Sequence, residues 1–236
     1  MDVVELLPHR LHLLRFPVGQ AYLWRDGKAL TLIDAGPPGS GAASAAVAGS
    51  FGTVRRIVLT HFHEDHAGGA AELAELTGEP EVLAHHADAP VVRSELPPPP
   101  PVFEDWERPL YAKASQLLPQ GNWLHPPAVT DLSDGDTLDF GGGAQVIHVP
   151  GHTDGSIALH LPAHGVLFTG DTVAASPVDG KVLLGVFNLD RPQAIASFHR
   201  LAELDTDVAC FGHGDPVIGK ASAAIRSSAD TYRASD

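Results

Sequence analysis

The feature that most restricts this chain is a short run of histidines and acids, HFHEDH at residues 61–66, directly after a β-branched segment. Residues 56–60 predict a buried strand, and residues two apart in an extended segment share a face. His61 and His63 can therefore bind one ion together, while Asp65 and His66 can face a neighbouring position. The pattern HxHxDH arises by chance in roughly 0.4% of chains with this composition, so it indicates a metal site.

Three later loops repeat the arrangement of a strand that runs into glycine and a metal-type ligand. The predicted strands at 145–149, 166–169 and 207–211 lead into His152, Asp171 and His213, respectively. Binding residues commonly lie on loops at one end of a sheet, so we expect these loops to share one edge. Five imidazoles and two carboxylates suit Zn²⁺, and Fe²⁺ and Mn²⁺ accept the same ligands.

The remaining pattern predicts strands alternating with short helices. Strands are expected at 12–16, 20–24, 29–34, 81–84 and 156–161, and helices at 40–50, 70–76, 191–204 and 218–232, with Ser40 as the N-cap of the first. Residues 88–130 differ, because Pro97 to Pro101 form an unbroken proline run. We interpret this segment as an insertion with one helix at about 109–118, too short and proline-rich for a core of its own.

Composition excludes several classes of partner. The chain has 236 residues with 29 acidic and 15 basic side chains, a net charge of −14, which disfavours nucleic acid and anionic membrane surfaces. The single cysteine, Cys210, allows no internal disulfide and fits a reducing cytoplasm. The first residues lack the uninterrupted apolar region of a signal peptide, and no stretch approaches 18 apolar residues. We therefore expect a cytoplasmic protein.

Five blocks resemble the metallo-β-lactamase superfamily, in the style of its glyoxalase II-like and lactonase-like hydrolases. These blocks are LIDAG (32–36), THFHEDHAGG (60–69), PGHTDGS (150–156), FTGD (168–171) and FGHG (211–214), in the order of that family. The resemblance implies an α/β fold, the αββα four-layer sandwich of the family. It also implies one domain over residues 1–236, with the proline-rich insertion at about 88–130.

The resemblance further implies two Zn²⁺ ions per chain, with Fe²⁺ or Mn²⁺ as alternatives. The first ion would be bound by His61, His63 and His152. The second would be bound by Asp65, His66 and His213, and Asp171 would bridge both. Asp34 would support the site without binding metal itself.

The implied function is a hydrolase that uses a metal-bridging hydroxide to cleave a small ester, thioester or lactone. Two ions about 3.5–4 Å apart lower the pKa of a shared water, and Asp65 could hold this nucleophile and pass a proton to the leaving atom. One alternative is an iron-dependent persulfide dioxygenase with one Fe²⁺ at His61, His152 and Asp171. Others are β-lactam hydrolysis as a minor activity and a non-catalytic metal-binding protein.

The sequence also departs from some relatives. Asp171 stands where a cysteine-containing lactamase would need a thiolate, and Cys210 does not match that position. Only 23 residues follow His213, whereas glyoxalase II proper adds a helical glutathione-binding domain there. The partner we expect is a small acyl compound, and a homodimer is an alternative assembly.

Other residues are more ambiguous. Arg93, Asn188 and Arg191 are candidates for gripping the substrate, and nothing in their spacing selects one. Phe103, Trp106, Tyr111 and Trp123 could wall the metal site, cover a sheet edge or form a dimer contact. Cys210 is expected to pack in the core. The remaining histidines are expected to be ordinary side chains. His148 is expected to be packed or supporting, and His85 and His86 are expected at the surface or at the start of a helix. The others are expected to face solvent: His9, His12, His125, His160, His164 and His199.

Overall fold

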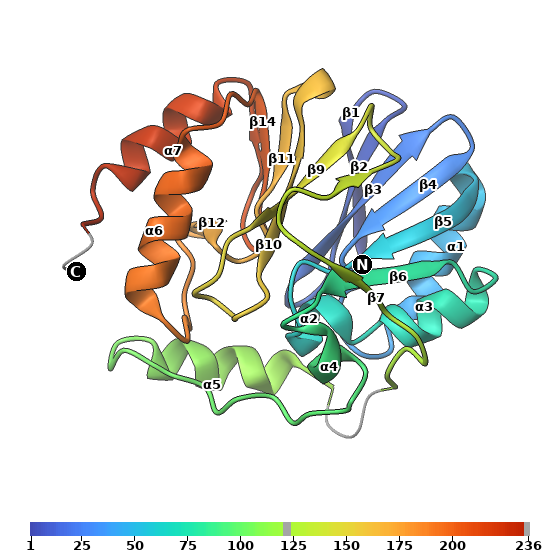
Figure 1. Cartoon of the computed structure of the whole chain (residues 1–236), viewed down its shortest axis with the longest axis horizontal. Coiled ribbons are helices and arrows are strands. Elements are labelled where there is room, and N and C mark those ends of the chain that lie inside the picture. Colours follow the sequence, from blue (N-terminus) through green and yellow to red (C-terminus); the bar gives the residue numbers. More distant parts are fainter. Residues whose placement is uncertain (120–123, 234–236) are drawn as a thin grey trace. The chain divides into compact units, whose positions relative to one another are not determined.

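A computed structural model describes residues 1–119 and 124–233 (Figure 1). The chain divides into two compact units. The first comprises Met1–Pro98 and Pro109–Leu132, and the second comprises Pro99–Arg108 and Ser133–Asp236. The prediction of one domain with an insertion at about 88–130 stays a prediction.

The first unit contains a seven-stranded sheet whose order follows the sequence. Its strands are β1 (Asp2–Leu7), β2 (Leu11–Arg15), β3 (Gln20–Asp26), β4 (Ala29–Ile33), β5 (Thr53–Val58), β6 (Glu81–His85) and β7 (Thr130–Leu132). Strands β1 to β4 pair antiparallel, and β4 to β7 pair parallel. The carboxyl ends of β4, β5 and β6 therefore meet at one edge, where Asp34, the histidine run and Asp88 follow.

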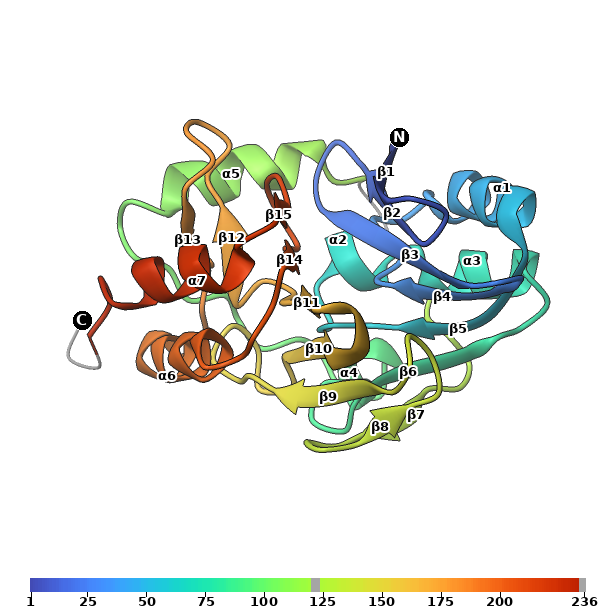
Figure 2. The same ribbon diagram turned by 90° about the horizontal axis from the view of Figure 1, so that it is seen from above.

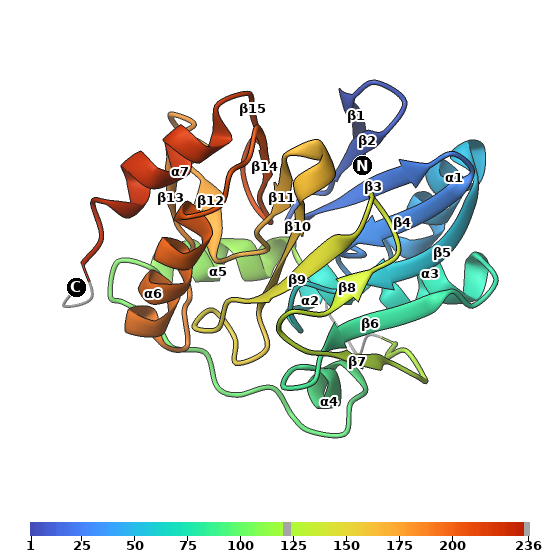
Figure 3. The same cartoon turned by 45° about the horizontal axis from the view of Figure 1, so that its top comes forward.

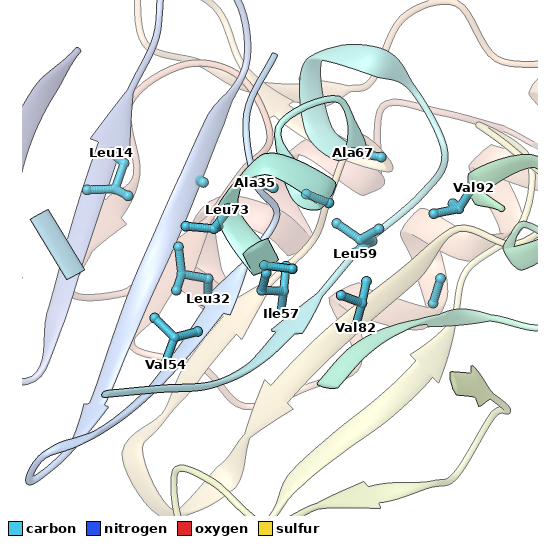
Figure 4. Packing of buried hydrophobic residues seen from close by; sticks show 14 of the residues in the cluster. Leu14, Leu32, Ala35, Val54, Ile57, Leu59, Ala67, Leu73, Val82 and Val92 are labelled. Carbon is cyan, nitrogen blue, oxygen red and sulfur yellow. The ribbon is translucent and has the colours of Figure 1, made fainter. Parts of the chain in front are cut away.

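Helices cover this sheet. They are α1 (Gly41–Phe51), α2 (Glu64–Ala67), α3 (Ala70–Leu76) and α4 (Ala89–Val92). A further helix, α5 (Arg108–Leu117), begins where the chain returns from the second unit. Figure 2 shows α1 and α3 side by side on one face. Beneath them lies an apolar core in which Leu32, Ile57 and Val82 from neighbouring strands meet Leu73 of α3 (Figure 4).

The second unit contains a six-stranded sheet in the order β15-β14-β11-β10-β9-β8. The strands are β8 (Thr137–Leu138), β9 (Ala144–His148), β10 (Ile157–Leu161), β11 (Val166–Phe168), β14 (Val208–Cys210) and β15 (Val217–Ile218), with a separate hairpin of β12 (Val173–Ala175) and β13 (Val182–Leu184). The 3-10 turn η1 (Pro162–His164) joins β10 to β11. Helices α6 (Arg191–Ala202) and α7 (Ala221–Ala229) pack together, as Figure 3 shows.

Strand directions in this sheet gather three loops at one edge. Strand β10 is antiparallel to both β9 and β11, and β11 is parallel to β14. Strands β9, β11 and β14 consequently point the same way. The loops that follow them carry His152, Asp171 and His213.

The sequence predicted most of these elements, and some details were wrong. Ser40 does not cap α1 with its side chain: its hydroxyl donates to the carbonyls of Pro37 and Ala35, and Glu72 accepts the hydrogen bond from the Gly41 N–H instead. The last helix begins at Ala221 because Val217–Ile218 pairs as β15. His12 and His160, expected at the surface, are buried, because each lies on a strand between two apolar residues. His85, expected at the surface or at a helix start, is buried at the end of β6, where it pairs with Leu132.

Candidate metal centre

Asp34 organises the ligand loop of the first unit. It is 2% exposed, follows β4 and has φ of +64°, an uncommon conformation for a residue other than glycine. Its carboxylate accepts hydrogen bonds from the Thr60 N–H (2.7 Å) and hydroxyl (2.9 Å), and it lies 2.9 Å from Nδ1 of His66. One buried carboxylate therefore fixes both the start of the histidine run and its last imidazole.

These contacts show that Nδ1 of each ring carries a proton. The Nδ1–H of His66 donates to the Asp34 carboxylate. The Thr60 hydroxyl has given its only proton to Asp34, so at 3.0 Å it accepts from Nδ1–H of His61. Nε2 is therefore the nitrogen of His61 and His66 that can bind a metal, the arrangement that metal-binding histidines take when a carboxylate or hydroxyl orients the ring.

His63 and Asp65 complete the group in the first unit. The ring centroids of His61 and His63 are 4.8 Å apart, and those of His61 and His66 are 4.3 Å apart. Oδ2 of Asp65 lies 3.5 Å from Nε2 of His66. A Cβ on Gly19 would lie 2.6 Å from the carbonyl oxygen of Asp65, so only glycine permits this approach. Burial, and then the Asp65 carboxylate, raise the pKa of Glu64. The four predicted ligands of this unit form one cluster.

Two supporting residues escaped the sequence analysis, Thr60 and Asp88. Asp88 is 2% exposed and accepts a hydrogen bond from the Phe62 N–H at 3.0 Å, so it fixes the backbone between His61 and His63. Asp88 follows β6 closely, as Asp34 follows β4 and His61 follows β5. The signal was present in the sequence, since acids after neighbouring parallel strands meet at one edge.

In the second unit, one carboxylate oxygen faces two imidazoles. Oδ2 of Asp171 lies 3.1 Å from Nε2 of His213 and 3.6 Å from Nε2 of His152. The side chain of His152 is 1% exposed, that of Asp171 11% and that of His213 37%. The three ligands predicted on separate loops therefore lie together, with one side of the cluster open.

Backbone hydrogen bonds hold these three loops. Gly212 donates to Gly170, and Ala175 of β12 donates to His213. The hydroxyl groups of Thr153 and Ser156 lie 2.8 Å apart inside the His152 loop, and the Ser156 hydroxyl accepts from the Thr153 N–H at 3.0 Å. Gly151 has φ of +125°, and a Cβ there would lie 2.2 Å from the backbone nitrogen of Ala194 in α6, so glycine is required beside His152.

The other candidate residues have varied outcomes. Arg93 forms ion pairs with Glu95 and Asp131, both at 2.9 Å, which raise its pKa and hold its guanidinium within the first unit. Cys210 is fully buried, as expected, and burial raises the pKa of its thiol. His148 is half-buried and lies 2.8 Å from the Asp154 carbonyl. Phe103 contacts Phe187 edge-on within the second unit, and Trp123 lies outside the described residues.

The donor chemistry fits a divalent transition metal. The first unit offers three imidazoles and one carboxylate, and the second offers two imidazoles and one carboxylate, all nitrogen and oxygen ligands of the kind that Zn²⁺ and Fe²⁺ accept. The rings of His61 and His66, each oriented through its Nδ1–H, also fit the binding of such a metal.

Comparison with known sequences identifies the family. The sequence model described as the metallo-beta-lactamase superfamily matches residues 14–213. The chain belongs to this superfamily of metallo-hydrolases. Its predicted α/β fold class is confirmed by that match and by the mixed sheets with helices in each unit.

Individual relatives agree with this assignment. The probable metallo-hydrolase YflN of Bacillus subtilis (strain 168) is 32% identical, covering 80% of this chain and 76% of the relative. The hydroxyacylglutathione hydrolase of Aeromonas hydrophila is 33% identical, covering 64% of this chain but only 44% of the relative. The likeness to the second enzyme therefore spans less than half of its length.

A solved structure, TTHA1623 in a di-iron-bound form, superposes with a TM-score of 0.63 at 27% identity. The match covers 92% of this chain and 94% of that chain.

Among the described residues, no helix is long and apolar enough to cross a membrane. The cytoplasmic location stays a prediction.

Proposed function

We propose that this superfamily member is a hydrolase of a small ester, thioester or lactone that binds two divalent metal ions. The observation that carries the proposal is Asp171 Oδ2, which faces Nε2 of both His152 and His213 within 3.6 Å. A carboxylate that serves two metal ions needs this position between histidines of both sites. The relatives named as metallo-hydrolases support the reaction class.

In this proposal His61, His63 and His152 bind the first ion. Asp65, His66 and His213 bind the second ion, and Asp171 serves both. Asp34 supports the site by accepting from Nδ1–H of His66, which leaves Nε2 to bind the metal. Zn²⁺ is the metal that we propose, with Fe²⁺ or Mn²⁺ as alternatives that the same donors accept.

When bound, the two ions lower the pKa of water and polarise the acyl oxygen. Asp65 holds the proton that the attacking water gives up and delivers it to the leaving oxygen or sulfur. The water oxygen forms a bond to the acyl carbon, and the bond from that carbon to the leaving atom breaks. The products are a carboxylic acid and an alcohol or thiol, and the substrate is a small acyl compound rather than a nucleic acid or a membrane.

The test is hydrolysis of a panel of lactones, thioesters, esters and β-lactams by protein reconstituted with Zn²⁺ and with Fe²⁺. Hydrolysis of an acyl compound that requires metal and is lost in Asp65→Asn is the expected result. Stoichiometric metal without turnover of any acyl compound would overturn the proposal. Oxygen uptake with glutathione persulfide in the iron-loaded protein would instead establish the dioxygenase, for which the di-iron structure shows that related sites accept iron.

A further inference from the structure

The second unit contains a small cavity of about 60 Å³ outside the cluster of proposed metal ligands. One wall comes from residues 102–107, directly after the proline run, and the other comes from residues 188–191, which lead into α6. Its lining residues are Val102, Glu104, Glu107, Asn188, Leu189 and Arg191.

Asn188 provides a buried hydrogen-bond acceptor in this wall. The residue is 6% exposed, and its amide nitrogen donates to the Gly185 carbonyl at 2.6 Å, which fixes the orientation of the amide. Its Oδ1 atom is buried and accepts no hydrogen bond from any residue that the structure describes. A buried acceptor of this kind costs free energy unless a bound group donates to it.

Glu107 adds a buried negative charge. Glu107 is 2% exposed. Its two carboxylate oxygens accept hydrogen bonds from the N–H groups of Phe187 (3.0 Å) and Glu104 (2.9 Å). A carboxylate has about four acceptor positions, so Glu107 can accept further donors. The lining contains two carboxylates and one guanidinium, and it therefore carries a net negative charge that favours a cationic donor.

The cavity lies beside a loop that carries a proposed metal ligand. The N–H of Leu189 donates to the carbonyl of His152 at 3.3 Å, and the N–H of Asp190 donates to Gly151 at 2.9 Å. A ligand in the cavity would thus contact Leu189, which is hydrogen-bonded directly to the His152 loop.

We propose that this cavity is a substrate subsite that binds a primary ammonium group. The ammonium would donate to Oδ1 of Asn188 and to the Glu107 carboxylate, so the preferred substrate would be an amine-bearing ester, thioester or lactone. This inference rests on the proposed hydrolase function, and it assigns a role in specificity to part of the 88–130 segment. Water or an inorganic cation is the competing occupant.

Binding can be measured without turnover. The melting temperature of zinc-loaded protein is followed in propylammonium chloride and in potassium chloride at equal ionic strength. We expect propylammonium to raise the melting temperature with a saturable concentration dependence, because a ligand that binds the folded state stabilises it. Asn188→Leu should abolish the rise, and Gln193→Leu, an exposed change on α6, should retain it. An equal rise in potassium chloride, or one that persists in Asn188→Leu, would contradict the proposal.

Glu104→Gln is a second variant in case Asn188→Leu fails to fold. Glu104 is exposed, so its replacement leaves the core intact while removing one charge from the lining. We expect it to raise the propylammonium concentration needed for half of the stabilisation. An unchanged concentration dependence in Glu104→Gln would overturn the role of the negative lining.

Substrate preference provides the second readout. Two thioesters of equal length are compared, one ending in an ammonium group and the other in a methyl group, over a series of spacings. For at least one spacing, Asn188→Leu should lower kcat/KM for the ammonium compound at least tenfold more than it lowers kcat/KM for the methyl compound. An equal effect on both compounds would contradict the subsite while leaving the hydrolase intact. Absence of hydrolysis of every ester, thioester and lactone would count against the proposed function instead, and the melting experiment would still decide the binding.

Discussion

Oδ2 of Asp34 lies 2.9 Å from Nδ1 of His66, and both side chains are almost completely buried. Since the same carboxylate accepts two hydrogen bonds from Thr60, it joins the end of β4 to both ends of the histidine run. We predict that Asp34→Asn weakens metal binding about 10- to 100-fold, because the amide cannot orient the imidazole in the same way. Competition with a chromophoric chelator measures the affinity. Asp230→Asn, an exposed change after α7, is the control, and equal affinities in the two variants would exclude this role.

Asp171→Ala tests the bridging assignment. Removal of the carboxylate that faces His152 and His213 should lower the metal content by at least one ion per chain. Elemental analysis of reconstituted and desalted protein gives the stoichiometry, and circular dichroism checks that the variant is folded. The assignment fails if the folded variant retains the same number of ions as the parent protein.

Metal removal should also reduce stability. Each ion that binds only the folded state adds about 2.7 kcal/mol when the free metal is 100 times its dissociation constant. For a chain of this length, the loss of each ion on chelation corresponds to a fall in the melting temperature of roughly 5–10 °C. Calorimetry with and without chelator, followed by addition of Zn²⁺, measures the change. Identical curves would mean that the ions do not bind to the folded protein where we place them.

Gly151→Ala tests the close approach of the His152 loop to α6. The new methyl group would meet the Ala194 backbone in addition to adopting a strained φ. We expect a loss of at least about 1–3 kcal/mol in the free energy of unfolding, together with weaker metal binding. Gly143→Ala also has a large positive φ, +103°, and its new Cβ would meet only Thr137 at an ordinary 3.6 Å, so it gives the conformational cost without the close contact. Equal losses in both variants would show that the contact with Ala194 contributes nothing.

Burial of His160 should make the free energy of unfolding depend on pH. Burial lowers its pKa below the ordinary value of 6.5, and the Asp205 carbonyl opposes this only in part. The unfolded chain therefore binds the proton first as the pH falls. The contribution of His160 is complete above about pH 6.5 and is lost as the pH falls through the lower pKa of the folded state.

The corresponding variant is His160→Gln. It should show a smaller decrease in the free energy of unfolding between about pH 7.5 and 5.5 than the parent protein, as measured by urea titration in chelator. His199→Gln, exposed on α6, should follow the parent curve. If His160→Gln follows the parent curve too, the burial of His160 does not contribute to the pH dependence of stability.

The ligand loops were predictable because chemistry and periodicity agreed there. A β-branched run followed by HFHEDH specifies both a strand end and a metal-type cluster, and β5 ends at Val58, just before that run. The same logic placed His152, Asp171 and His213 at the ends of β9, β11 and β14. Local sequence alone could not show which side chains support the ligands. Asp88 and Thr60 act through tertiary hydrogen bonds, and their partners are distant in sequence or depend on a neighbouring strand.

Other differences have similar physical causes. Ser40 favours helix capping by residue type, yet its hydroxyl donates to the carbonyls of Ala35 and Pro37 in the preceding turn and makes no capping bond to the helix. His12 and His160 read as polar surface residues, but their positions on central strands bury them, so sheet position outweighs residue type. The short strands β7, β8 and β15 carry too few residues for any periodicity to reveal them.

The central claim is that one chain binds two metal ions through the seven assigned ligands. The most direct test is elemental analysis of protein that is purified without chelators or a metal-binding tag and then supplied with Zn²⁺ and desalted. The account predicts close to two zinc ions per chain in the parent protein and fewer in Asp171→Ala. A parent protein that retains one ion per chain or fewer would contradict it.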